Sequence, residues 1–216
     1  MVLILVQPGD TAAAIDYAAR HFIKIGQEAI AKKGFFTVAL SGGKTPFPIY
    51  QKITAPPLSQ QLDWQKVFLF WSDERAVGAN DPKSNYQMSM QAGFNKLPIP
   101  KEQILRMPAE KDPVQEALAY EAEIQKIANG QLDLILLGLG ADGHIASLFP
   151  KTAALLEKHR LAAANHVPLQ GWRMTLTFKC LNQSRNIAIY AFGPEKRQIL
   201  KNVLQQHTHN YPVNQL

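Results

Sequence analysis

Short apolar segments alternate along this chain with stretches of helical character, and that alternation restricts the fold more than any other feature. The apolar segments span residues 35–41, 67–73, 132–140, 173–178 and 186–192. They are too short to cross a membrane and are flanked by polar loops, as buried strands are. Strands that alternate with helices predict an α/β fold in which helices flank a Rossmann-like, parallel-rich sheet.

The segments between the strands have the spacing or composition of helices. From Thr11 to Lys33, apolar residues recur at intervals of three, four and seven, which predicts an amphipathic helix that ends at Gly34. Further helices are expected after Pro46, over 84–94 and 113–128, and from Pro194 to Gln206. The first residues, MVLILV, predict a buried edge strand, because they lack the basic start of a signal peptide.

Composition and charge exclude several classes of protein. A chain of 216 residues, 46% of them hydrophobic, predicts one domain over residues 1–216. Its net charge of +6 comes from scattered Lys and Arg, so we expect no nucleic-acid partner but a small anionic substrate. The single cysteine, Cys180, lies among apolar residues and is expected to be a buried thiol. We expect a cytoplasmic protein with no membrane partner, as a monomer or a weak homo-oligomer.

Polar clusters follow four of the strands. In a helix-flanked parallel sheet, ligands bind beyond the carboxyl ends of the strands, so chemistry is expected directly after each one. The four clusters are SGGKTP, SDER, GADGH and GPEK. They predict one site at one edge of the sheet.

The first cluster, Ser41 to Pro46, joins a buried strand to a helix. Gly42 and Gly43 let an anion approach the backbone, and the N-terminus of the helix would point at the same place. The spacing matches neither a nucleotide-triphosphate loop nor a dinucleotide motif. A phosphate cradle and a plain tight turn both remain open.

The second cluster contains Asp73, Glu74 and Arg75. Carboxylates beside an arginine can orient sugar hydroxyls, or can place the guanidinium where it stabilises developing negative charge. A solvated surface ion pair is the alternative, but the position at a strand end favours a functional role. Ser84 or Asn85 is expected to cap the next helix.

The third cluster, GADGH, leaves the strand over 132–140. His144 is suited to take a proton from water near neutral pH, and the glycines around it permit a sharp turn. Asp142 would orient either the imidazole ring or a substrate hydroxyl. A histidine hydrogen-bonded within a buried turn is the structural alternative, and Ser147 lacks the GxSxG elbow of a serine hydrolase.

Two further cations, Arg173 and Lys196, lie near strand ends and would close on a phosphate, although either alone is more often a surface charge. His207 and His209 form an HxH pair without an evident third ligand, so no metal site is expected.

The segments LSGGKTP, WSDERAVGANDPKSNY, LDLILLGLGADGHIASLFP and WRMTLTFKCLN resemble the glucosamine-6-phosphate isomerase/6-phosphogluconolactonase family, and within it the lactonases. The resemblance covers residues 10–205. It implies a phosphosugar isomerase/deaminase-like domain that needs no metal or organic cofactor. The implied activity is hydrolysis of 6-phospho-D-glucono-1,5-lactone in the pentose phosphate pathway.

The resemblance also implies roles for individual residues. His144 would be the general base that activates water, and Arg75 would help to hold the lactone and its developing oxyanion. Asp73 and Asp142 would orient the sugar ring or the histidine. The phosphate would be bound by Ser41, Gly42, Gly43, Arg173 and Lys196. Lys44, where relatives commonly carry Ser or Arg, would contact the phosphate or simply be exposed.

The chain departs from the family pattern at Ile145 and Lys151, and it stops at YPVNQL, where relatives continue into a further strand. Two other functions remain as alternatives. A glucosamine-6-phosphate deaminase would carry a ring-opening glutamate where this chain has SLFP. A non-catalytic phosphosugar sensor would carry a helix-turn-helix ahead of the first long helix. The sequence therefore favours the lactonase.

Overall fold

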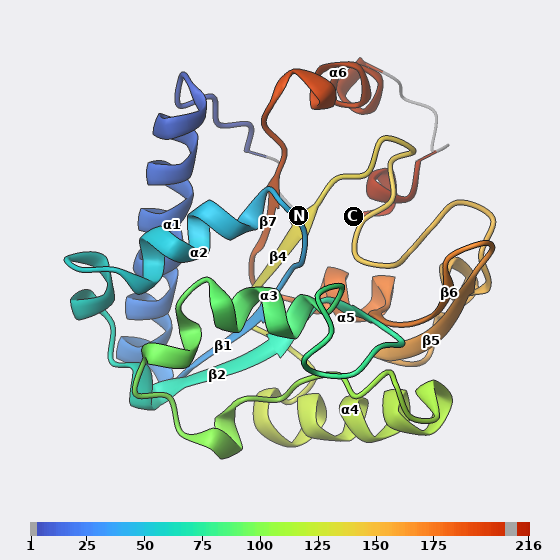
Figure 1. Cartoon of the computed structure of the whole chain (residues 1–216), viewed down its shortest axis with the longest axis horizontal. Helices are drawn as coiled ribbons and strands as arrows, with labels where there is room; N and C mark the ends of the chain where they lie inside the picture. Colours follow the sequence, from blue (N-terminus) through green and yellow to red (C-terminus); the bar gives the residue numbers. More distant parts are fainter. Residues whose placement is uncertain (1–3, 206–210) are drawn as a thin grey trace.

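A computed structural model describes residues 4–205 and 211–216, which form helices packed around two sheets (Figure 1). The helices are α1 (Thr11–Lys33), α2 (Pro46–Thr54), α3 (Asn85–Gln91), α4 (Pro113–Ala128), α5 (Phe178–Gln183) and α6 (Arg197–Gln205). The strands are β1 (Phe36–Leu40), β2 (Val67–Trp71), β3 (Asp73–Arg75), β4 (Leu134–Gly138), β5 (Ala162–Val167), β6 (Gly171–Leu176) and β7 (Ile187–Tyr190). The predicted α/β class is confirmed.

The larger sheet has four parallel strands in the order β2-β1-β4-β7. Every residue of β1 is buried, which explains why its sequence is a continuous apolar run and not an alternating one. The register pairs Val38 with Leu69 on one side and with Leu134 on the other. Since all four strands run in the same direction, their carboxyl ends meet at one edge.

The smaller sheet has three antiparallel strands in the order β3-β6-β5. The sequence predicted a strand over 173–178 but neither the strand at 162–167 nor this second sheet. The segment 162–167 reads AAANHV, which is too poor in β-branched and aromatic residues to signal a strand. Ser72 joins the two sheets, because its N–H donates to Leu40 O and its carbonyl accepts from the Leu176 N–H, both at 2.8 Å.

The core divides into two clusters on the two faces of the larger sheet. Val38 and Leu40 pack with α1 and α2, whereas Ala39, between them, packs with α4 and α5. Figure 1 shows α1 and α2 on one side of the sheet and α4 on the other. Cys180 is fully buried in the cluster that contains Ala39, which confirms the prediction of a core thiol.

The bounds predicted for the first helix, Thr11 to Lys33, are confirmed, and the residues at its two ends explain them. The carboxylate of Asp10 accepts the N–H of Ala13 at 2.8 Å, and Gly34 ends the helix at φ +89°. An N-terminal Asp cap and a left-handed C-terminal glycine are the preferred residues at these positions.

The predicted edge strand at the N-terminus is wrong for the residues that the structure describes. Ile4, Leu5 and Val6 form no strand, and their side chains are exposed. Residues 1–3 lie outside the described part of the chain. An apolar run of a few residues without a partner strand has nothing to hold it in a sheet.

Candidate active site

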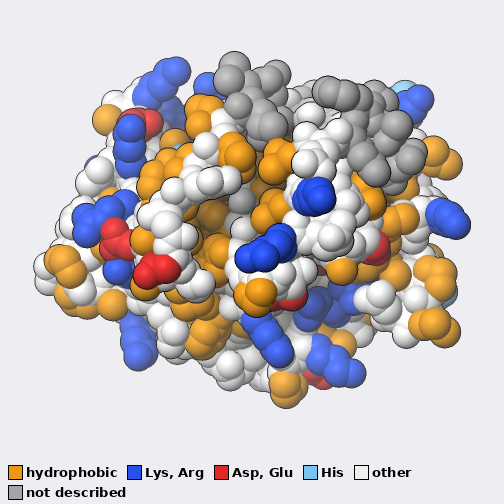
Figure 2. Space-filling view, turned by 90° about the horizontal axis from the view of Figure 1, so that it is seen from above, with side chains coloured by type: hydrophobic (Ala, Val, Ile, Leu, Met, Phe, Trp, Pro, Cys, Tyr) orange, Lys and Arg blue, Asp and Glu red, His pale blue; other side chains and the backbone are white. Residues whose placement is uncertain are grey.

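The four polar clusters do converge. They follow β1, β2, β4 and β7, the four parallel strands of the larger sheet, so they meet at its carboxyl edge. The SDER cluster is itself partly a strand, because Asp73 to Arg75 form β3 of the smaller sheet. The site therefore lies where the two sheets join. Figure 2 shows a hollow with apolar side chains inside and with both basic and acidic side chains on the surface around it.

A tight turn carries His144 away from β4. The Gly140 N–H donates to His144 O at 2.9 Å, and the Gly143 N–H donates to Gly140 O at 3.0 Å. Gly143 has φ +76°, and a Cβ there would lie 2.5 Å from the ring of Tyr211. Only glycine meets both conditions, so the sequence motif is explained by the turn.

Two contacts hold the imidazole ring of His144, one with Asp142 and one with Phe149. Its Nδ1 lies 2.5 Å from Oδ1 of Asp142, and its ring stacks on Phe149 with 4.0 Å between ring centroids. Of the two roles open for Asp142, the structure shows contact with the histidine. An acceptor at Nδ1 favours the tautomer with its lone pair on Nε2, the atom left to take a proton.

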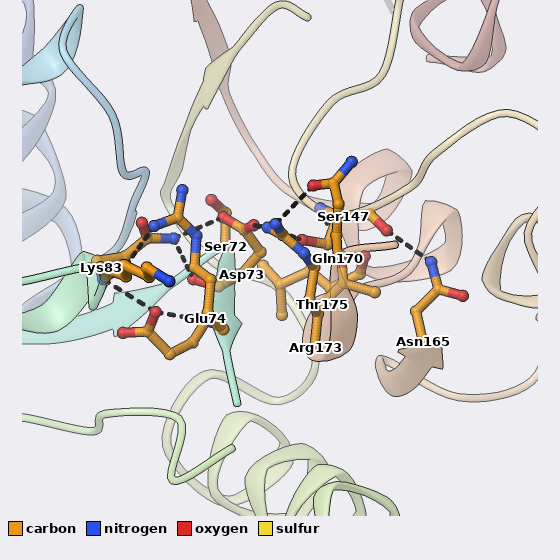
Figure 3. A network of polar contacts seen from close by, with 12 residues as sticks. Ser72, Asp73, Glu74, Lys83, Ser147, Asn165, Gln170, Arg173 and Thr175 are labelled. Carbon is orange, nitrogen blue, oxygen red and sulfur yellow. Dashed lines mark hydrogen bonds and ion pairs between the residues drawn. The ribbon is translucent and has the colours of Figure 1, made fainter. Parts of the chain in front are cut away.

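Asp73 is buried and joins three elements of the site (Figure 3). Its Oδ1 accepts from Asn85 Nδ2 at 3.0 Å, and its Oδ2 accepts from Ser147 Oγ at 2.5 Å. Arg173 Nη1 lies 4.0 Å from the same Oδ2. The carboxylate therefore ties α3 to the loop that carries His144.

The carboxylate of Glu74 bonds to different residues from that of Asp73, and it fixes the start of α3. Its carboxylate accepts from Ser84 Oγ and from the N–H groups of Asn85 and Tyr86, all at 2.8–2.9 Å. Burial raises the pKa of this carboxyl, and the hydrogen bonds act against that rise. Ser84 Oγ also accepts the Gln87 N–H, so the predicted cap of this helix is Ser84.

Arg75 and Arg173 are directly paired across β3 and β6, so their side chains leave the same face of the smaller sheet. Arg75 Nη1 donates to Lys83 O, and Arg173 Nη2 donates to Gln170 Oε1 at 2.8 Å. The Nε atom of each arginine is buried and has no partner among the described residues. Burial lowers the pKa of Arg173, Asp73 raises it and Arg75 lowers it further. Arg173, expected at the start of a strand over 173–178, is the third residue of β6, which begins at Gly171.

The loop from Ser41 to Lys44, here called the glycine loop, offers fewer backbone donors to an anion than the sequence predicts. Ser41 cannot offer its N–H to a ligand, because that group donates to Tyr50 Oη, which in turn donates to Ser41 O. Over residues 4–205 and 211–216, the N–H groups of Gly42, Gly43 and Lys44 find no acceptor. With the N-terminus of α2 behind them, these three donors could bind an anion.

Lys196 lies across β4 from this loop. Its Nζ donates to Leu139 O at 2.8 Å. On the other side, Ser41 Oγ comes within 4.0 Å of the position that a Cβ on Gly138 would take. The loop and Lys196 thus both border the end of β4, where the His144 turn begins.

Three residues of the site were not singled out from the sequence for the roles that they have here. Phe149 packs on both His144 and Arg173, whose Cζ lies 5.3 Å from the ring centre. Ser147 is fully buried and bonded to Asp73, while Asn85 anchors the same carboxylate. Ser147 and Phe149 belong to the motif around His144, which was the available signal.

Neither a metal cluster nor a membrane-spanning helix occurs in the described part of the chain. No group of three or more His, Cys, Asp or Glu side chains converges there, and no helix is both long and apolar enough to cross a bilayer. His207 and His209 lie outside the described residues.

The family model of glucosamine-6-phosphate isomerases/6-phosphogluconolactonase matches residues 9–216. The chain belongs to this family. Among its relatives in the glucosamine-6-phosphate isomerase/6-phosphogluconolactonase family, the 6-phosphogluconolactonase of Chlamydia pneumoniae is 43% identical over 191 residues, which are 88% of this chain and 72% of that protein. That of Synechocystis is 41% identical over 180 residues, 80% and 73% of the two chains.

Solved structures of the family have the same fold. The 6-phosphogluconolactonase of Thermotoga maritima is 28% identical, with a TM-score of 0.83 over 94% of this chain and 90% of that one. The enzyme from Trypanosoma cruzi is 27% identical, with a TM-score of 0.83 over 95% and 86%. The family predicted from the sequence motifs is confirmed, and so is the prediction of an enzyme of this lactonase type.

Proposed function

We propose that this chain hydrolyses 6-phospho-D-glucono-1,5-lactone to 6-phosphogluconate in the pentose phosphate pathway, with His144 as the general base. One observation supports this most: the Asp142–His144 pair stands at the same sheet edge as a loop of three unpartnered N–H groups. The first can activate water, and the second can hold a phosphate. The names of the relatives point to the same substrate.

In the proposed mechanism, Nε2 of His144 takes a proton from a water molecule as the water oxygen attacks the C1 carbonyl of the lactone. The carbonyl electrons move to oxygen and form a tetrahedral oxyanion. The oxyanion collapses, the bond from C1 to the ring oxygen breaks, and the imidazolium returns its proton to that oxygen. A base held in place contributes about 10² to 10⁴ in rate.

We assign the cations of the site to two negatively charged groups, the oxyanion at C1 and the phosphate. Arg75 stabilises the oxyanion, whereas Gly42, Gly43 and Lys44 bind the phosphate with Arg173 and Lys196. The buried and unpartnered Nε atoms support anion binding by both arginines, because each is a donor without an acceptor among the described residues. Asp73 orients the sugar ring, and the Ser41 backbone, bonded to Tyr50, holds the loop in shape.

The decisive experiment is lactone hydrolysis, with 6-phosphogluconate as the readout, for wild type and His144→Ala. We expect the variant to fold and to lose about 10² to 10⁴ in rate. Near-wild-type activity would remove His144 from the mechanism. Glucosamine 6-phosphate serves as the comparison substrate, and sustained ammonia release from it would favour a deaminase.

The two arginines are separated by their kinetic effects. Arg173→Ala should raise KM more than it lowers kcat, since it is assigned to the unreacting phosphate, and Arg75→Ala should mainly lower kcat. The opposite pattern would exchange the two assignments.

The setting of this reaction belongs to the same proposal. The enzyme works in the cytoplasm on a small phosphosugar, without metal or organic cofactor, as a monomer or a weak homo-oligomer. Its net charge of +6 suits an anionic substrate. Activity that survives chelator treatment is the expected result, and its loss would contradict this part.

A further inference from the structure

A pocket of about 470 Å³ opens beside the glycine loop and is walled by Gly43, the loop before α3 and α3 itself. Three of its lining residues are cations: Lys44, Arg75 and Lys83. No Asp or Glu is among the described residues that line it. A concave site lined by one sign of charge attracts ligands of the opposite sign.

Asp73 and Glu74, which precede Arg75 in the chain, direct their carboxylates at other groups of the site and do not line the pocket. Both oxygens of Glu74 accept hydrogen bonds from the start of α3, and both oxygens of Asp73 accept from Asn85 or Ser147. Over residues 4–205 and 211–216, neither Lys44 nor Lys83 forms an ion pair. Among the described residues, the charged side chains that line the pocket are therefore all cations.

The backbone of Lys83 is fixed on both sides. Its carbonyl accepts from Arg75 Nη1, and its N–H donates to Asp81 Oδ1 at 2.7 Å. Figure 3 shows Lys83 at the opposite end of the polar network from Asn165. These contacts place the backbone of Lys83 next to Arg75, another cation that lines the pocket.

We propose that Lys83, with Lys44, determines specificity for a phosphorylated substrate by attracting its dianion into this pocket beside the glycine loop. Gly43 belongs to both the pocket and the loop, so an anion held by the two lysines is already next to the N–H groups of the cradle. The identity of the substrate rests on the proposed function. The role of Lys83 does not follow from the sequence motifs, because it depends on where the loop over 81–84 places its charge.

The kinetic test compares 6-phospho-D-glucono-1,5-lactone with D-glucono-1,5-lactone, which lacks the phosphate. In Lys83→Ala and in Lys44→Ala, the ratio of the two kcat/KM values should fall about three- to tenfold, and further in the double variant, as expected for the loss of one charge near an anion. Salt at about 1 M should shrink the effect, since it screens charges beyond about 3 Å. Lys101→Ala, which removes the same charge from an exposed position outside the pocket, should keep the wild-type ratio. A ratio that stays the same in Lys83→Ala, or falls equally in Lys101→Ala, overturns the proposal.

A binding test keeps this proposal separate from the lactonase activity. Calorimetric titration with inorganic phosphate at low salt should show binding to wild type, weakened about three- to tenfold in Lys83→Ala and in Lys44→Ala but not in Lys101→Ala. If the wild type binds phosphate but hydrolyses no lactone, only the proposed function fails. If the wild type does not bind phosphate, or Lys83→Ala binds it as tightly, the proposal about this pocket fails.

Discussion

The Oδ1 atom of Asp142 lies 2.5 Å from Nδ1 of His144 and accepts the backbone N–H of the same residue at 3.2 Å. One carboxylate oxygen thus holds both the ring and the main chain of the proposed base. Asp142→Ala should lower kcat for lactone hydrolysis, because the ring loses the partner that keeps its proton on Nδ1. The loss should be smaller than that of His144→Ala.

The control for this change is Asp10→Ala. Asp10 is also an exposed aspartate that accepts a nearby backbone N–H, but it caps α1. It should leave kcat unchanged while costing about 1 kcal/mol of stability. An Asp142→Ala enzyme with wild-type kcat would show that the contact does not serve catalysis.

Phe149 should act through His144 and Arg173. Its ring stacks on the imidazole and lies under the guanidinium, so it limits the motion of both. Phe149→Leu should lower kcat while the protein remains folded. Phe178→Leu is the matched control, because both phenylalanines are 8% exposed. Both changes should cost about 1 kcal/mol in urea unfolding, and an equal kcat in the two variants would contradict a positioning role for Phe149.

Gly42 and Asn85 should be coupled. A Cβ on Gly42 would collide with the side-chain amide of Asn85, which holds Asp73 in place. Gly42→Ala should therefore cost about 1–3 kcal/mol in the free energy of unfolding, and much less when Asn85→Ala is already present. Gly78→Ala, where no atom lies within 4 Å of the new Cβ, is the control. Additive effects of Gly42→Ala and Asn85→Ala in a double-mutant cycle would argue against the collision.

Glu74 should make stability depend on pH. Burial raises its folded-state pKa above the ordinary value of 4.5, so the folded protein keeps this proton over a range in which the unfolded chain has lost it. The stability contributed by Glu74 is then complete below about pH 4.5 and is lost as the pH rises through the folded pKa. Urea unfolding of wild type and Glu74→Gln from pH 4.5 to 7 measures this, and the advantage of wild type should fall with rising pH. Exposed Glu102 supplies the control Glu102→Gln, and parallel curves for wild type and Glu74→Gln would refute the prediction.

Cys180 should be inert in the folded protein. It is fully buried in the core, and burial raises the pKa of its thiol to about 12, whereas the thiolate is the reactive form. At pH 8, a thiol reagent such as dithionitrobenzoate should react with Cys180 only as fast as the protein unfolds. Full reaction within seconds without denaturant would contradict the core position.

Much of the fold follows from features of the sequence that involve only neighbouring residues. The apolar run VFLFW predicts a mostly buried strand, the Asp10 and Gly34 caps limit the first helix, and the glycines around His144 indicate a turn. These depend on neighbours in sequence, so the parallel sheet and the polar clusters at its carboxyl edge could be predicted. The edge strand expected over residues 1–6 is wrong at Ile4–Val6, because a strand also needs a partner strand, which the sequence does not show.

Tertiary structure alone decided the rest, because the contacts join residues far apart in the chain. The segment from Ala162 to Val167 becomes a strand only by pairing with β6. On its other side β6 pairs with β3, which places Arg173 opposite Arg75. The amide of Asn85 meets Asp73, and the hydroxyl of Ser147 reaches the same carboxylate across 74 residues. Local propensity and spacing do not show which distant residues will be in contact. The main residues of the site could therefore be predicted from the sequence, but their hydrogen-bond partners could not.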